Sequence, residues 1–178
     1  GGMVNIRDEG WKEIKVGAVF EGGQAEDKDP ITRERVAQAT ARNVEYAPVL
    51  GTAEDFGPAL WRLAVERGVP QAARSSVTAD GASWIWNVAA DYFPDSVQIV
   101  DWYHACEHLA QAAEVLYPKD ADKADRWFRD HQTNLFQGQI HTITTALEAR
   151  QLAEYAQYFH THQRRMRYQE FREEGYPI

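Results

Sequence analysis

The sequence predicts an α/β fold in which a mixed sheet with helical crossovers is followed by an all-helical segment. Three patterns support this prediction: apolar residues that alternate near the N-terminus, strands that alternate with helices in the middle of the chain, and a C-terminal part without strand patterns. Strands that alternate with helices are typical of parallel strands joined by helical crossovers, and a preceding hairpin makes the sheet mixed. A chain of 178 residues is long enough for one domain with a substantial core.

A hairpin is predicted at the N-terminus. Residues 2–7 form its first strand, the turn-like sequence RDEG follows, and residues 11–20 form the second strand, in which apolar side chains recur at every second position. The next segments predict, in order, a polar loop in EGGQAEDKDP, a short helix in ITRERVAQATARN and a brief strand in EYAPVLG. Pro48 interrupts this last strand, because proline cannot donate a hydrogen bond to a neighbouring strand.

Helices and strands alternate between residues 52 and 116. Thr52 and Asp55 have the spacing of a capping box, and they open a helix that closes at Gly68. The elements after it are, in order, a strand in ARSSVTADG that ends at Asp80, a helix from a Ser83 cap to about Phe93, a strand in SVQIVD that ends at Asp101, and a helix from His104 to Leu116.

The chain beyond Pro118 is predicted to be helical throughout. Its apolar residues have helical spacing, and we expect three helices with breaks near Gln137-Gly138 and near His160. The sequence therefore divides into a sheet-containing part, residues 1–117, and a helical part, residues 118–178.

Composition and charge restrict the function. The chain has 27 acidic and 19 basic side chains, a formal net charge of -8, which is the opposite of a compact nucleic-acid-binding domain. No apolar run approaches the ~20 residues that span a bilayer. The N-terminus has no signal-peptide pattern, and the single cysteine, Cys106, cannot form an internal disulfide. We therefore expect a cytoplasmic protein that does not associate with membranes.

Two acidic residues end consecutive predicted strands. In sheets with parallel crossovers, functional side chains gather at the carboxyl ends of the strands, where Asp80 and Asp101 are both expected. Two adjacent carboxylates would suit Mg²⁺ or Mn²⁺, which prefer oxygen ligands. The alternative is that each aspartate caps the helix that follows its strand.

The sequence HACEH, residues 104–108, offers a second kind of site. It matches the His-x-x-Glu-His pattern in which His104 and His108 would hold Zn²⁺ while Glu107 activates water. A further glutamate on a later helix would be required, and the sequence does not single one out. The alternative is that both histidines make ordinary polar contacts at a helix start.

Aromatic and basic residues give candidate contacts with nucleic acid. Trp84 lies close to Asp80 in sequence and could stack on a base, although paired indoles on a helix are more often core residues. A local basic strip near the C-terminus could meet phosphates or could be an ordinary solvated helix face. Its members are Arg164, Arg165 and Arg167.

Five stretches together resemble the DDE transposases of bacterial insertion sequences, and the ISKra-type family in particular. They are GGMVNIR, WKEIKVGAVFE, VTADGASWIWN, IVDWYHACEHL and FREEGYPI. The resemblance implies a ribonuclease H-like mixed sheet in residues 1–117, with residues 118–178 as a helical insertion before the third catalytic acid. It also implies three acids around two Mg²⁺ or Mn²⁺ ions, transposon-end and target DNA as partners, a homo-oligomer, and a place at the bacterial nucleoid when DNA is bound.

The resemblance assigns roles to three residues of this chain. Asp80 in TADGA matches the second catalytic acid, and Asp101 and His104 in DWYH match the Asp-x-x-His motif of such transposases. In the family the first acid directly precedes the Gly-Gly-Met stretch and the third follows GYPI. We therefore expect a fragment that lacks two of the three acids and is inactive alone. The alternatives are a zinc hydrolase built on HACEH and a decayed, non-catalytic core that acts as a binding module.

Overall fold

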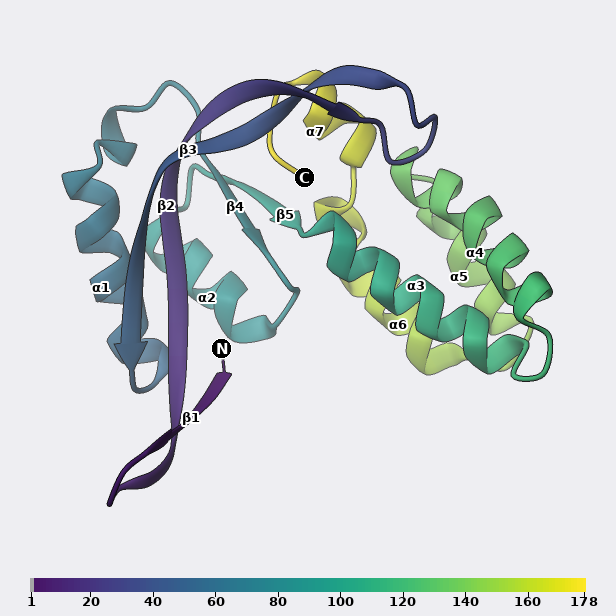
Figure 1. The fold of residues 1–178 in the computed structure, drawn as a ribbon, viewed down its shortest axis with the longest axis horizontal. Coiled ribbons are helices and arrows are strands. Elements are labelled where there is room, and N and C mark those ends of the chain that lie inside the picture. The colour runs from purple at the N-terminus through teal and green to yellow at the C-terminus, as the bar shows by residue number, and fades with distance from the viewer. Residues whose placement is uncertain (1) are drawn as a thin grey trace. The chain divides into compact units, whose positions relative to one another are not determined.

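The computed structural model describes residues 2–178 and has a mixed α/β fold (Figure 1). Gly1, the first residue of the GGMVNIR stretch, lies outside the described residues. The chain forms two compact units built from interleaved segments. Among the described residues, the first unit comprises residues 2–23, 40–77 and 82–98, and the second comprises residues 24–39, 78–81 and 99–178. The boundary expected between residues 117 and 118 stays a prediction.

The N-terminal strands form a three-stranded antiparallel sheet in the order β1-β2-β3. Its strands are β1 (Gly2–Ile6), β2 (Gly10–Lys28) and β3 (Arg35–Leu50). The predicted hairpin is confirmed, since β1 pairs with β2 in a register that sets Met3 opposite Glu13. β3 lies at the edge of the sheet, where Pro48 is tolerated because one side of the strand needs no hydrogen-bond donor.

Two predictions for this region are wrong. The polar segment EGGQAEDKDP continues strand β2 as far as Lys28, and the segment ITRERVAQATARN contributes to strand β3 instead of a helix. Pairing with β2 explains the second error, because the helix propensity of Arg, Ala and Gln is a weak preference that contacts in a sheet override. Opposite side chains also interact, as when the Asn43 amide donates to Glu21 at 3.0 Å.

Helix α1 (Ala53–Glu66) confirms the predicted capping box and the stop at Gly68. The Thr52 amide donates to Asp55 Oδ2 at 2.9 Å, and Gly68 has a φ of 77°, which glycine adopts without strain. A short 3₁₀ helix (Val69–Gln71) follows. The helix packs closely on the sheet at Gly17, where an added Cβ would lie 2.8 Å from Leu60 Cδ1.

Two short strands form a second sheet, so the single mixed sheet that the sequence predicted is present as two sheets. β4 (Ser76–Ala79) and β5 (Val97–Val100) confirm the predicted strands. The backbone amide of Val97 donates to the Ser75 carbonyl at 3.0 Å, and the backbone amide of Asp101 donates to the Ala79 carbonyl at 2.8 Å. The constant offset between these two pairs shows that the strands are parallel.

Helix α2 (Ser83–Tyr92) connects these strands as predicted, but Ser83 is not its cap. The N-cap residue is Ala82, and no side chain caps the helix. Within the first unit, Trp84 of this helix packs edge-on against Phe56 with ring centroids 5.6 Å apart, and Lys15 lies 5.0 Å from its ring.

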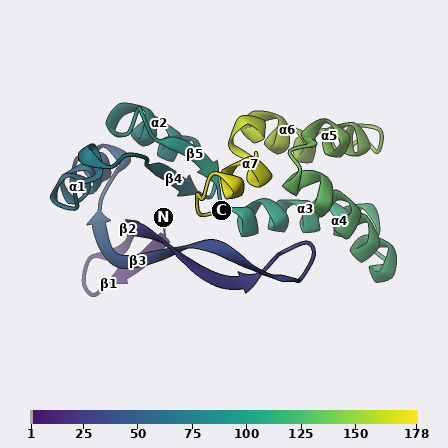
Figure 2. The same cartoon turned by 90° about the horizontal axis from the view of Figure 1, so that it is seen from above.

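The second unit is mainly helical. Its helices are α3 (Trp102–Leu116), α4 (Ala121–Phe136), α5 (Ile140–Glu148), α6 (Ala153–His162), a 3₁₀ helix (Gln163–Arg165) and α7 (Tyr168–Glu173). The breaks expected at Gln137-Gly138 and near His160 are present, the second directly after His162. The expected number of three helices beyond Pro118 is wrong, because a further break separates α5 from α6 and the chain continues to α7. α3 packs against α4 and α5 against α6 (Figure 2). None of the described helices is both long and apolar enough to cross a membrane.

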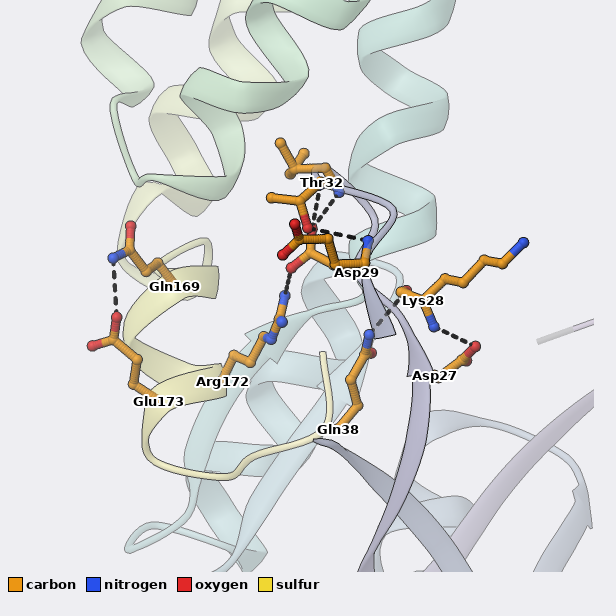
Figure 3. Close-up of polar contacts among 10 residues, drawn as sticks. Asp27, Lys28, Asp29, Thr32, Gln38, Gln169, Arg172 and Glu173 are labelled. Atoms are coloured by element: carbon orange, nitrogen blue, oxygen red, sulfur yellow. Dashed lines mark hydrogen bonds and ion pairs between the residues drawn. The ribbon is translucent and has the colours of Figure 1, made fainter. Parts of the chain in front are cut away.

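The turn between β2 and β3 belongs to the second unit and is tied to α7 (Figure 3). Asp29 Oδ1 accepts the amides of Ile31 and Thr32 at 2.7 and 2.6 Å, and its other oxygen pairs with Arg172. Burial opposes ionisation of Asp29, but the bonds from Thr32, Arg172 and Ile31 together lower the pKa of this carboxyl. The turn is therefore held by a charged contact.

Candidate metal site at the ends of two parallel strands

Asp80 and Asp101 each directly follow one of the two parallel strands. The bond from the Asp101 amide to the Ala79 carbonyl places both aspartates at the same end of the β4-β5 sheet. Asp80 is exposed and Asp101 is half-buried, and both belong to the second unit. The topology thus places the two acids together at the carboxyl end of this sheet.

Asp101 is the N-cap of α3. Its Oδ1 accepts the His104 amide at 2.9 Å, so α3 begins at Trp102, two residues before the predicted start. The capping alternative is therefore confirmed for Asp101, and one of its two oxygens is occupied by the helix. Asp80 does not share this role, because the N-cap of α2 is Ala82.

Tyr158 and His162 of α6 lie against Gly81, the residue after Asp80. An added Cβ on Gly81 would be 3.3 Å from both Tyr158 Cε2 and His162 Nε2, and 3.5 Å from the Tyr158 hydroxyl. Gly81 also has a φ of 99°, which side-chain-bearing residues rarely adopt. The glycine of TADGA therefore allows α6 to approach the acidic end of β4.

The Tyr158 ring is held by histidines. It stacks on His108 with centroids 3.7 Å apart and an interplanar angle of 22°, and it lies 5.0 Å from His162. Burial, followed by the charges of Asp80 and Asp101, raises the pKa of Tyr158, so the phenol stays protonated. Burial also lowers the pKa of His108 and of His162, which favours neutral imidazoles.

Tyr158 and His162 were not among the residues that the sequence singled out. Their only sequence signal is the spacing of four, which places both side chains on one face of α6. Nothing in that spacing indicates contact with Gly81, which comes from the packing of distant segments.

The geometry does not favour the zinc alternative. The helix brings His104 and His108 together, with ring centroids 4.9 Å apart, as the spacing of four requires. However, His104 Nδ1 lies 3.3 Å from Glu107 Oε2, and one face of His108 is covered by Tyr158. Within residues 2–178 no group of three or more His, Cys, Asp or Glu side chains could hold a metal ion, and catalytic zinc sites use three protein ligands.

The candidate DNA contacts are only partly available. Trp84 belongs to the first unit, is half-buried and contacts Lys15 and Phe56. In the basic strip, Arg167 pairs with Glu170 at 2.6 Å. The other two members differ in burial: Arg164 is exposed and Arg165 is half-buried.

Asp80 and Asp101 supply two carboxylates at the same end of the β4-β5 sheet. Mg²⁺ is usually bound by one or two carboxylates together with waters or substrate phosphates, so carboxylates are the ligand type that a hydrated Mg²⁺ ion uses. Two ions held at working distance need further acids.

Comparisons of the chain with protein-family models, with curated proteins and with solved structures gave no match.

Proposed function

We propose that this chain carries part of the catalytic core of a DDE-type transposase with a ribonuclease H-like arrangement. Such an enzyme is a polynucleotidyl transferase that cuts and joins DNA at transposon ends. The observation that supports the proposal is the position of Asp80 and Asp101, which follow adjacent parallel strands at one edge of a sheet. The motif resemblance matches Asp80 to the second catalytic acid of such transposases and Asp101 to their Asp-x-x-His motif.

In this proposal Asp80 is the principal metal ligand of the chain. Asp101 has two tasks: Oδ1 fixes the start of α3, and its second oxygen would hold the cation. His104 belongs to the same motif, and its amide fixes the orientation of the Asp101 carboxylate. A bound Mg²⁺ or Mn²⁺ supplies Lewis-acid stabilisation for displacement at phosphorus.

The wider function extends the same proposal. Cleavage and strand transfer need a second ion and hence acids beyond Asp80 and Asp101. We propose that the active protein supplies these further acids, and that it cleaves and transfers strands as a homo-oligomer on transposon-end and target DNA. The net charge of -8 agrees with a function that needs bound cations, because an acidic surface does not attract the phosphate backbone of DNA without them.

Mn²⁺ titration by calorimetry tests the proposed site. We expect the 178-residue protein to bind Mn²⁺ and the Asp80→Asn variant to bind about tenfold more weakly or worse, because an amide is a poorer ligand than a carboxylate. Asp101→Asn should also weaken binding while keeping the cap, since Asn caps helices as well as Asp.

Asp120→Asn is the matched control. Asp120 caps α4 in the same way, with Oδ1 accepting the Lys123 amide at 3.0 Å. We expect this variant to bind Mn²⁺ like the unchanged protein. Equal affinity of the unchanged protein and the Asp80→Asn variant would remove the basis for the proposed function.

A further inference from the structure

The Tyr158 hydroxyl is a buried polar group that the proposed function does not yet use. Its oxygen is buried and has no hydrogen-bond partner among residues 2–178. Buried hydroxyls in folded proteins nearly always have a partner, which can be a protein group, an ordered water or an ion. The unpaired phenol therefore has a hydrogen-bonding position left for a water or an ion.

The ring of Tyr158 has little freedom to move. One face is covered by His108 at a centroid distance of 3.7 Å, and the ring edge lies 3.3 Å from the position that a Cβ on Gly81 would take. Phe159 and His162 meet it edge-on, with centroids 5.4 and 5.0 Å away. These contacts fix the hydroxyl beside Gly81, the residue that directly follows Asp80.

Both imidazole and carboxylate groups lie around the hydroxyl, since His162 Nε2 approaches the same point beside Gly81. The charges of Asp80 and Asp101 both act on it, yet neither carboxylate is its hydrogen-bond partner. A phenol that bonds neither carboxylate has a hydrogen-bonding position left for a further molecule. The waters of a hydrated divalent cation suit this position, because carboxylates accept from them and a phenol can exchange a hydrogen bond with them.

We propose that Tyr158 is a positioning residue of the Asp80–Asp101 site, and that its hydroxyl hydrogen-bonds a water in the hydration shell of a divalent cation held there. This inference rests on the proposed function, because it requires a cation at the two acids. It adds α6, within the helical part of the chain, to the residues that define the site. His108 and His162 hold the ring in place through their ring contacts.

The Tyr158→Phe variant tests this role, because it removes the hydroxyl and keeps the ring stacked on His108. Mn²⁺ affinity is measured from the free-ion electron paramagnetic resonance signal. We expect the Kd to rise about 3- to 10-fold, the effect of losing one hydrogen bond. Tyr155→Phe is the matched control, since it removes a hydroxyl from the same helix, and it should leave the Kd unchanged.

Thermal unfolding without metal separates positioning from a structural role. Tyr158→Phe removes a hydroxyl that has no partner, so the metal-free variant should unfold at the same temperature as the unchanged protein or higher. A lower unfolding temperature would indicate that the hydroxyl supports the fold and would overturn the proposal.

The remaining outcomes distinguish this inference from the proposed function. If the unchanged protein binds Mn²⁺, Asp80→Asn weakens binding and Tyr158→Phe binds normally, Tyr158 has no positioning role while the two-acid site stands. If the unchanged protein binds no Mn²⁺, or if Asp80→Asn binds normally, the proposed function fails and this inference fails with it.

Discussion

Gly81 shows how a single residue decides whether the candidate site can form. Its φ of 99° and its contacts with Tyr158 and His162 both require the absence of a side chain. An added Cβ would be 3.3 Å from two side-chain atoms, which is tighter than ordinary van der Waals contact. Gly81 of the TADGA motif is therefore constrained by the structure where α6 approaches the end of β4.

The Gly81→Ala variant should be less stable than the unchanged protein. Left-handed backbone conformation in a residue with a Cβ costs about 1–2 kcal/mol, and displacement of Tyr158 adds to this cost. Urea unfolding followed by circular dichroism measures the difference. Gly22→Ala is the control, because Gly22 has open space around it and no left-handed φ. Equal stability of Gly81→Ala and Gly22→Ala would show that Gly81 is not constrained.

At the scale of elements, local patterns predicted some segments and failed for others. The capping box of Thr52 and Asp55 and the stop at Gly68 depend on neighbouring residues, and they predicted α1 correctly. The segment ITRERVAQATARN has helix-forming residues, but it becomes part of β3 because β2 lies alongside. A single sequence does not reveal which strand will be its neighbour, so this class of error has a physical cause.

The contact between the β2–β3 turn and α7 gives a prediction about stability and pH. Asp29→Asn keeps an acceptor for the turn amides but removes the charge that pairs with Arg172, so we expect a loss of about 1–2 kcal/mol at pH 7. Because the folded-state pKa of Asp29 is lowered, this stabilisation is present above the unfolded-state pKa and is lost as pH falls through the folded-state pKa.

Urea unfolding at neutral and acidic pH checks this prediction. The difference between the unchanged protein and Asp29→Asn should shrink as the pH falls below about 4. Asp27→Asn is the matched control, since exposed Asp27 contacts only the amide of Lys28 among the bonds described for it. A difference that stays constant down to low pH would show that the charge of Asp29 contributes nothing.

For the whole molecule, the sequence predicted the α/β class and the order of strands and helices from residue 52 to 116. It also placed Asp80 and Asp101 at strand ends, because each strand pattern is local. It did not predict the separation into two sheets or the approach of Tyr158 to Gly81. Both depend on packing between segments that are distant in sequence, which residue patterns do not encode.

Paramagnetic broadening of backbone amide signals by Mn²⁺ is the most direct test of the two-acid site. In a nitrogen-15 NMR spectrum of the 178-residue protein, substoichiometric Mn²⁺ should first broaden the amides next to the ion. We expect these to be Gly81, His104 and Tyr158 with their immediate neighbours, and the effect should disappear in Asp80→Asn. Broadening spread over exposed carboxylates such as Asp125, or unchanged in Asp80→Asn, would contradict a cation site at Asp80 and Asp101.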